Sequence, residues 1–258
     1  MITIAQESPS KIRTLELGRG AAALAVVMHH ASVSSNAFTS ADYGEIFLWG
    51  KYGVDFFFVL SGFIIYHVHG NDQLGYESAY QFLLKRLRRI YIPYLPITVL
   101  LMAAYLIFPA LSQGQREWGW FTSVTLLPSE SPAALSTAWT LVFEMTFYFF
   151  FLVFYASRYF YFFVLIWVLT VIGNAIFEFN YLMAMPLFIT LLDPIVLEFI
   201  IGMLAARMFA MVKDTQWPVF LVVGICGLAV FSLYGGLHRA VLGVALAPIV
   251  LSMALAEM

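Results

Sequence analysis

Charged residues are scarce in this chain of 258 amino acids, where Asp, Glu, Lys and Arg together make up 11%. A soluble globular domain usually contains about 25% charged residues. Hydrophobic residues make up 62%, and the mean hydropathy is +0.87. The composition excludes an ordinary soluble protein and predicts an all-α fold, a polytopic bundle of membrane-spanning helices.

Cysteine and a surplus of positive charge are also lacking. The single cysteine, Cys226, excludes an internal disulfide and a cysteine-based metal site. The net charge of −2 indicates that nucleic acid is not a partner. The first 14 residues are polar and precede an apolar stretch that is long enough to span, so we expect no cleavable signal peptide.

Long apolar stretches are what the chain has in abundance. A helix needs about 20 mostly apolar residues to cross a bilayer. About eight stretches meet this requirement: Leu15–Val33, Tyr52–Val68, Ile90–Phe108, Thr137–Tyr155, Phe160–Phe177, Pro194–Met211, Pro218–Tyr234 and Ala240–Leu255. A polar loop, Ser34–Gly50, and a longer loop, Pro109–Ser136, separate some of them, and Asn180–Leu192 is apolar but too short to cross. We expect one membrane-embedded domain over residues 1–258.

The distribution of lysine and arginine predicts the orientation. Eight spans place nine basic residues on the side of the N-terminus: Lys11, Arg13, Lys85, Arg86, Arg88, Arg89, Arg158, Arg207 and Lys213. The opposite side receives three: Lys51, Arg116 and Arg239. Basic residues concentrate in cytoplasmic loops, so we expect the N-terminus in the cytoplasm.

Arg19 and His30 both lie inside the first apolar stretch, where an arginine at mid-span costs about 2.5–3.5 kcal/mol. Eleven residues are close to three helical turns, so the two side chains share a helix face about 16 Å apart along the axis. Glu16 falls near the same face, whereas His29 points about 80° away from it. This face carries an acid, a base and an imidazole, and it marks a candidate site.

A second polar group occurs in the segment Gly53–Phe63. Asp55 opens a strongly apolar helix, and Ser61 and Gly62 lie deeper in it. Asp55 is a candidate binding residue, although the helix dipole alone also favours a carboxylate in a first turn. Ser61 is a second candidate, although small residues also permit close helix packing.

A basic stretch, Lys85–Arg89, precedes the third span. Arginine side chains match phosphate oxygens, and Arg86 and Arg89 would face the same way on a helix because they are three residues apart. The pattern indicates either a site for a phosphorylated ligand or an ordinary positive anchor at the cytoplasmic surface.

A third polar group lies among the aromatic residues of Trp139–Tyr148. Thr140, Glu144 and Tyr148 recur every four residues and form one polar stripe on an otherwise apolar helix. A carboxylate in such a helix should face the bundle interior. Glu144 is therefore a candidate site residue or a structural hydrogen-bond partner for another helix.

Taken together, these segments resemble acyltransferase family 3, integral membrane O-acyltransferases that modify bacterial surface polysaccharides. The family's first helix carries an Arg and a His separated by ten residues, usually with an acid three residues before the Arg. The matching segments, in chain order, are Glu16–Ala22 with His30, Gly53–Phe63, Arg86–Ile90 with Pro93 and Tyr94, Trp139–Tyr148 with Thr140 in place of the usual Ser, and Phe199–Met203.

The resemblance implies transfer of an acyl group, taken as acetyl, from cytoplasmic acetyl-CoA to a hydroxyl of a surface or exported polysaccharide or glycolipid. Acetyl-CoA is then a donor substrate, with no bound cofactor or metal. The implied partners are acyl-CoA, a lipid-linked or polymeric glycan acceptor and membrane lipid, at the bacterial inner membrane. The implied catalytic residues are His30, Glu144 and Arg19, and the candidate binding residues are Arg86, Arg89, Asp55, Glu16, Ser61 and Tyr148.

One departure leaves alternatives open. Family members are usually longer and end in further helices, so we expect the family's C-terminal helices to be missing and the chain to be a truncated product, a fragment or a short variant. An inactive scaffold is one alternative to the enzyme. A small proton-coupled transporter is another, because Arg19, His30, Asp55 and Glu144 would also suit a polar path across a membrane.

Overall fold

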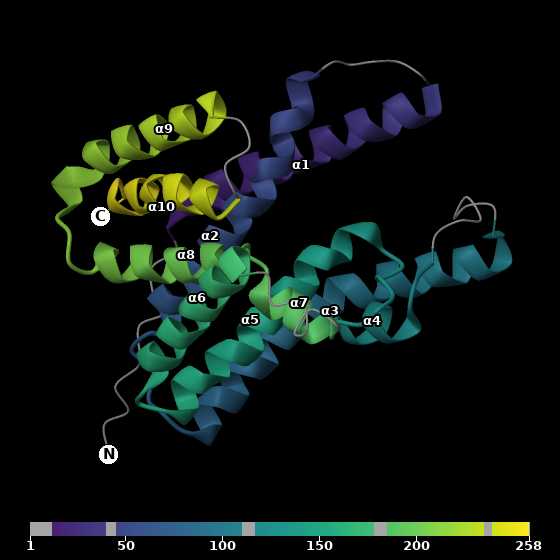
Figure 1. Ribbon diagram of the computed structural model, residues 1–258, viewed down its shortest axis with the longest axis horizontal. Coiled ribbons are helices and arrows are strands. Elements are labelled where there is room, and N and C mark those ends of the chain that lie inside the picture. The colour runs from purple at the N-terminus through teal and green to yellow at the C-terminus, as the bar shows by residue number, and fades with distance from the viewer. Residues whose placement is uncertain (1–11, 40–44, 110–116, 178–184, 235–238, 258) are drawn as a thin grey trace. The chain divides into compact units, whose positions relative to one another are not determined.

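A computed structural model describes residues 12–39, 45–109, 117–177, 185–234 and 239–257, and these residues form helices and connecting turns without a β-strand (Figure 1). The α-helices are α1 (Arg13–Thr39), α2 (Gly53–His69), α3 (Tyr76–Ile107), α4 (Trp120–Thr125), α5 (Trp139–Ala156), α6 (Phe160–Phe177), α7 (Pro186–Leu192), α8 (Val196–Phe209), α9 (Trp217–Leu233) and α10 (Arg239–Leu255). Short 3-10 helices are η1 (Glu45–Tyr52), η3 (Ser136–Ala138) and η5 (Asp214–Gln216).

The predicted polytopic helix bundle is confirmed, and a helix occupies each of the eight expected spans. Five helical stretches in the described ranges are long and apolar enough to cross a bilayer: Phe47–His69, Tyr76–Ile107, Ser136–Ala156, Phe160–Phe177 and Asp214–Leu233. A sixth is reached if α7 and α8 form one broken span. Of the remaining two, α1 is less apolar because of its charged, His, Ser and Asn residues, and the apolar part of α10 is shorter than a full span.

Two helix boundaries differ from the sequence prediction. α1 continues to Thr39 and η1 begins at Glu45, so much of the expected polar loop Ser34–Gly50 is helical. α3 begins at Tyr76 rather than Ile90, and the basic stretch therefore lies within the helix. Leu, Gln, Lys and Arg are good helix formers, and they extend α3 in the N-terminal direction.

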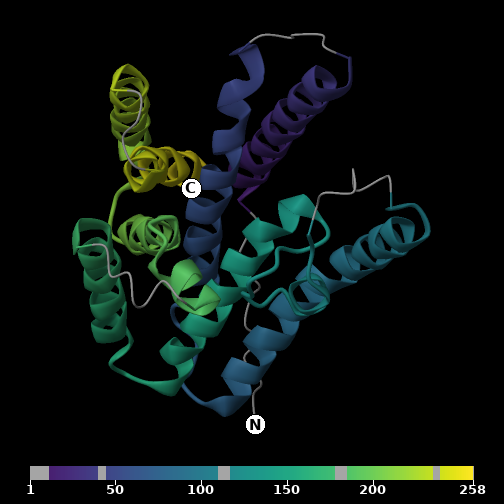
Figure 2. The same ribbon diagram turned by 45° about the vertical axis from the view of Figure 1, so that its right-hand side comes forward.

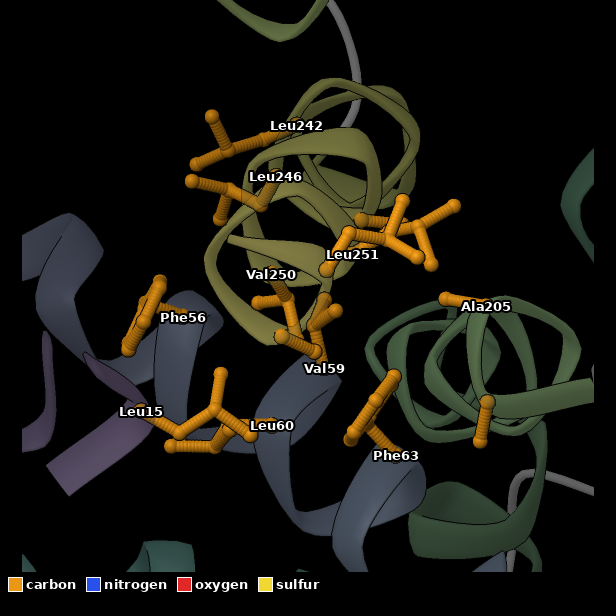
Figure 3. Close-up of a cluster of buried hydrophobic side chains, with 14 of the residues drawn as sticks. Leu15, Phe56, Val59, Leu60, Phe63, Ala205, Leu242, Leu246, Val250 and Leu251 are labelled. Atoms are coloured by element: carbon orange, nitrogen blue, oxygen red, sulfur yellow. The ribbon is translucent and has the colours of Figure 1, made fainter. Parts of the chain in front are cut away.

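The chain divides into two compact units. The first contains residues 1–71 and 197–258, and the second contains residues 72–196. The core of the first unit is a cluster of buried aliphatic and aromatic side chains (Figure 3). The cluster draws on five helices, α1, α2, α8, α9 and α10. Its members include Leu15, Phe56, Val59, Leu60, Phe63, Ala205, Phe231, Leu242, Leu246, Val250 and Leu251.

Two glycines bring α2 and α8 into backbone contact. A Cβ added to Gly62 would lie 2.0 Å from the carbonyl oxygen of Phe199, and a Cβ added to Gly202 would lie 2.0 Å from the carbonyl oxygen of Val59. Only glycine permits so close an approach. The small residue next to Ser61 thus serves helix packing, as one of the sequence interpretations predicted.

Other helix pairs of the first unit also lie side by side. α9 and α10 form a close hairpin, where a Cβ on Gly224 would meet Ile249. The purple α1 and the blue α2 run next to each other in Figure 2. Here a Cβ on Gly50 would come within 2.2 Å of the Ala25 carbonyl oxygen, so the entry to α2 lies directly on α1.

The second unit is centred on an antiparallel pair, α3 and α5 (Figure 1). Its core is rich in aromatic side chains, because α5 buries Phe147, Tyr148, Phe151, Phe154 and Tyr155. Phe82 of α3 contacts Tyr148, Phe151 and Tyr155 of α5, with ring centroids 5.2–6.1 Å apart. Aromatic pairs at this spacing contribute about 0.5–1.5 kcal/mol beyond simple burial.

The long segment expected as a loop, Pro109–Ser136, is folded against α3 in its described part. The Tyr94 hydroxyl donates to the carbonyl oxygen of Ser123 at 2.7 Å, and the Tyr91 hydroxyl donates to that of Thr125. Inside the segment, the Gly119 amide donates to Pro132 at 2.9 Å. These bonds satisfy backbone groups that an irregular segment would otherwise leave to water.

Candidate active site

The first group of predicted residues lies on α1. Glu16 and Arg19 are one turn apart, and their side chains approach to 3.7 Å as an ion pair in which Glu16 is 64% exposed and Arg19 33%. Arg19 and His30 lie on one uninterrupted helix, as their spacing predicted. His30 is exposed, so its imidazole is accessible to a ligand.

His29 and His30 occupy different environments although their rings are only 5.4 Å apart. A ring nitrogen of His29, Nδ1, lies 3.2 Å from the carbonyl oxygen of Phe47, and His29 is partly buried. The predicted difference in direction between the two histidines therefore has a structural basis: His29 binds η1, and His30 does not share that contact. A proton-transfer role consequently fits His30 better than His29.

Asp55 lies in the first turn of α2 and is fully buried. Both of its carboxylate oxygens accept hydrogen bonds from Arg239, at the start of α10. Arg239 is 42% exposed. The described contacts thus give Asp55 a structural partner within the first unit. Ser61 is partly buried beside the crossing of α2 and α8.

Arg86 is the central charge of the second unit. Its side chain is only 8% exposed, and its Nε has no hydrogen-bond partner in the described parts of the chain. The guanidinium lies 5.5 Å from the ring of Phe82 and 5.9 Å from that of Tyr148. Cation–π contacts of this kind contribute up to about 2 kcal/mol when water is excluded. They hold the group without using its hydrogen-bond donors.

Glu144 and Tyr148 lie beside this arginine. The Tyr148 hydroxyl donates to Oε1 of Glu144, and both Glu144 and Arg89 interact electrostatically with Arg86. Arg89 is exposed, whereas Arg86 is buried. Thr140, the third member of the predicted polar stripe, donates to the Thr137 carbonyl oxygen at 2.9 Å. The structure therefore brings four predicted site residues, Arg86, Arg89, Glu144 and Tyr148, into one cluster.

The cluster has a polar support at one end. The Tyr155 hydroxyl donates to Asp72 at 2.8 Å, and the amide of Gly75 donates to the Tyr155 carbonyl oxygen at 3.0 Å. Gly75 has a φ of +132°, which favours glycine. These contacts fasten the turn before α3 to the C-terminal end of α5.

Four functional or structural partners escaped the sequence interpretation. Arg239 and Asp72 lie far along the chain from the residues they bind, so spacing gave no signal. Tyr155 was missed because it is one of many aromatic residues on an apolar helix, and nothing in the sequence distinguishes it from the others. Glu198, which is fully buried on α8, had a usable signal, because it is an isolated acid within the apolar stretch Pro194–Met211.

Chemically, the second-unit cluster can receive an anion. A buried guanidinium with an N–H group that makes no hydrogen bond attracts a negative group, because burying a charge without full pairing costs several kcal/mol. Phosphate is well matched to arginine, which forms paired, charge-assisted hydrogen bonds with its oxygens. The first unit instead offers an exposed imidazole, which suits proton transfer near neutral pH.

Comparison with known proteins gives the family. Residues 12–256 match the family described as an acyltransferase domain, acyltransferase family 3. The exopolysaccharide production protein ExoZ of Rhizobium meliloti (strain 1021) is 28% identical over 205 residues, which cover 74% of this chain and 61% of that protein. The match thus spans less than two thirds of the relative's length. No solved structure matches the chain.

The family match covers nearly the whole chain, and the segments that carried the resemblance lie within it. At least five of the described helical stretches are able to span a bilayer. The chain is an integral membrane protein and belongs to acyltransferase family 3.

Proposed function

We propose that the chain transfers an acetyl group from acetyl-CoA on the cytoplasmic side to a hydroxyl of an exported or surface glycan. The acceptor is a polysaccharide or a lipid-linked glycan. The similarity to a protein of exopolysaccharide production supports a glycan acceptor. The excess of Lys and Arg on the side of the N-terminus supports an inner-membrane orientation with that terminus in the cytoplasm.

The observation that carries this proposal is Arg86. Arg86 is 8% exposed, lies against the rings of Phe82 and Tyr148, and has no hydrogen-bond partner at Nε among the described residues. Such burial is a costly arrangement for a positive anchor. Anchoring arginines normally extend their charge into water at the membrane surface. A binding role for the phosphate groups of CoA accounts for both the burial and the unused donor. Arg89 is exposed and supplies a second positive charge near Arg86.

Glu144 and Tyr148 set the charge of this site. Glu144 partly balances Arg86, and the bond from Tyr148 fixes the carboxylate on the helix that faces α3. An arginine balanced by one carboxylate retains attraction for an incoming phosphate while its burial is tolerated. Glu144 and Tyr148 therefore adjust donor binding in this proposal.

His30 is the proposed base of the transfer. Its imidazole takes the proton of the acceptor hydroxyl as that oxygen attacks the thioester carbonyl. The C–S bond then breaks, and the imidazolium returns the proton to the departing CoA thiolate. Arg19 is paired with Glu16 and lies about 16 Å from His30 along the helix axis. Its proposed role is to bind or support the acyl donor through its positive charge. Asp55 and Ser61 are proposed to shape the site from α2.

Labelled acetyl transfer tests the function against its alternatives. Inside-out membrane vesicles that contain the protein and a glycan acceptor are supplied with acetyl-CoA labelled in the acetyl group. We expect label to appear in the glycan, and Arg86→Ala to raise the KM for acetyl-CoA about 10-fold or more, since hydrogen bonds to charged groups contribute about 1.5–3 kcal/mol.

Two outcomes contradict the proposal. Movement of a solute without modification of the glycan indicates a transporter, and an absence of both activities indicates a scaffold. The matched control is Arg88→Ala, because Arg88 is exposed and belongs to the same basic stretch. If Arg86→Ala and Arg88→Ala, both correctly inserted, keep the same dependence on acetyl-CoA, Arg86 serves only as an anchor.

A further inference from the structure

Tyr155 connects two parts of the second unit through opposite ends of the same residue. Its hydroxyl donates to Asp72 at 2.8 Å, and its backbone carbonyl accepts from the amide of Gly75 at 3.0 Å. Asp72 and Gly75 belong to the turn that precedes α3, and Tyr155 lies near the end of α5. The turn and the helix end are therefore fixed to each other.

The ring of Phe82 lies between Tyr155 and Arg86 in a chain of contacts. The centroid of the Tyr155 ring lies 5.5 Å from that of Phe82, and the ring of Phe82 lies 5.5 Å from the Arg86 guanidinium. Phe82 and Tyr155 are only 1% and 2% exposed. Close-packed interiors leave little room for side chains to move, so the position of the Tyr155 ring sets that of Phe82, and Phe82 sets that of Arg86.

We propose that Tyr155 is a positioning residue for donor binding. Its hydrogen bond to Asp72 fixes the rings of Tyr155 and Phe82, and these rings orient the Arg86 guanidinium toward an acyl-CoA phosphate. This inference rests on the proposed function of Arg86. The hydroxyl of Tyr155 acts through Asp72 and Phe82, and Tyr155 does not itself contact the ligand.

The physical reason lies in the geometry of arginine. A guanidinium binds phosphate through parallel N–H groups in one plane, so a small rotation removes one of two bonds. Contacts with the rings of Phe82 and Tyr148 are weakly directional, so they restrain rotation of the guanidinium less than hydrogen bonds would. Fixed aromatic rings restrict the Arg86 side chain before the donor binds, so less conformational entropy is lost on binding.

The experiment compares variants that keep the ring and remove only the hydroxyl or its acceptor charge. Tyr155→Phe, Asp72→Asn and the double variant are prepared with Tyr159→Phe as the matched control, because Tyr159 is exposed and bonds to Arg158. Equilibrium binding of labelled CoA to the purified protein is measured together with the KM and kcat of acetyl transfer.

We expect Tyr155→Phe to weaken CoA binding and to raise the KM for acetyl-CoA about 3–10-fold, with kcat changed less than about 2-fold. The double variant should bind CoA about as well as the weaker-binding single variant, because both substitutions act on the same hydrogen bond: Tyr155→Phe removes its donor, and Asp72→Asn removes the charge of its acceptor. Tyr159→Phe should behave as the unmodified protein.

A lower yield or melting temperature of Tyr155→Phe with unchanged CoA affinity and KM would assign Tyr155 a purely structural role and overturn the inference. Additive effects of the two substitutions would overturn the coupling through Asp72. The Arg86→Ala variant distinguishes a failure of the proposed function from a failure of the positioning role. If it leaves CoA binding unchanged, the proposed function fails, whereas a loss with Arg86→Ala but none with Tyr155→Phe refutes only the positioning role.

Discussion

Asp55 and Arg239 form a two-pronged ion pair within the first unit, in which Nε and Nη2 of Arg239 each donate to one carboxylate oxygen at 2.9 Å. Asp55 is fully buried, whereas Arg239 keeps 42% of its side chain exposed. The bonds match the fork of the guanidinium to the carboxylate, the geometry that gives such pairs most of their strength. The pair joins the start of α2 to the start of α10.

Removal of Arg239 should therefore destabilise the first unit more than removal of an ordinary surface arginine. Arg239→Ala leaves a buried carboxylate without these two bonds, and we expect a loss of about 2–3 kcal/mol, reduced from a fully buried pair by the exposure of Arg239. Thermal unfolding in detergent measures the effect, with exposed Arg158→Ala as the control.

Replacement of Asp55 by the neutral residue asparagine provides the second test of this pair. Asp55→Asn in the Arg239→Ala background removes the isolated charge, so the double variant should unfold at a higher temperature than Arg239→Ala alone. Equal stability of these two variants would show that the charge of Asp55 is balanced elsewhere.

The close approach of α2 and α8 at Gly62 and Gly202 supports a prediction on helix packing. Gly62→Ala and Gly202→Ala each place a methyl group 2.0 Å from a backbone oxygen, which cannot move aside as a side chain would. We expect each to destabilise the protein by about 1–3 kcal/mol, measured as a fall in the melting temperature in detergent. Gly20→Ala on α1, where an added Cβ meets nothing within 4 Å, should be neutral or stabilising. Unchanged melting of Gly202→Ala would mean that the helices separate readily.

Local periodicity was sufficient to predict the α3 part and the α5 part of the cluster separately, but not that the two parts lie together. Arg86 and Arg89 share a helix, and Glu144 and Tyr148 are one turn apart and bonded, as their spacing indicated. The helix class and the approximate positions of the spans also follow from the apolar runs, because a bilayer demands that length and composition. Helix periodicity alone does not show that Arg86 is buried while Arg89 is exposed.

Contacts between distant segments were not predictable from one sequence. Asp55 and Arg239 are 184 residues apart, and Tyr155 and Asp72 are 83 residues apart. Spacing constrains only residues on the same helix, whereas these pairs depend on how helices pack. The early start of α3 was missed for a different reason, since charged helix formers carry no hydrophobic signal of a span.

Glu257 and Thr14 provide a prediction on pH. The amide of Thr14, in the first turn of α1, donates to the Glu257 carboxylate at 2.8 Å, and this bond lowers the pKa of Glu257 below its usual value. A carboxyl group whose pKa is depressed by folding stabilises the folded state above its unfolded pKa, and this contribution is lost as the pH falls through the folded pKa. The unmodified protein should therefore melt at a higher temperature than Glu257→Gln at neutral pH, and the difference should vanish below about pH 3. A difference that persists at that pH would exclude the charge of Glu257 as its cause.

Orientation is open to a labelling test. We expect Pro109–Ser136 outside and the connection between α8 and α9 inside, because the inner side carries most of the Lys and Arg. Single cysteines are introduced at exposed Glu117 and Thr215 in a Cys226→Ala background, since Cys226 is itself exposed. An impermeant thiol reagent applied to cells with a permeabilised outer membrane should label the cysteine at 117 and spare that at 215. The reverse pattern would invert the proposed orientation.

The two adjacent histidines of α1 offer the sharpest test of catalysis. His30→Ala removes the proposed base, and we expect acetyl transfer to fall by about 10²–10⁴-fold. His29→Ala is the matched control, because His29 lies next in sequence but contacts the Phe47 carbonyl oxygen, so its loss should act mainly through stability. Transfer is measured in membranes with equal amounts of correctly inserted protein. If His30→Ala retains the activity of the unmodified protein, or if His29→Ala is the more damaging change at equal protein level, the proton is taken by another group and His30 has no part in the chemical step.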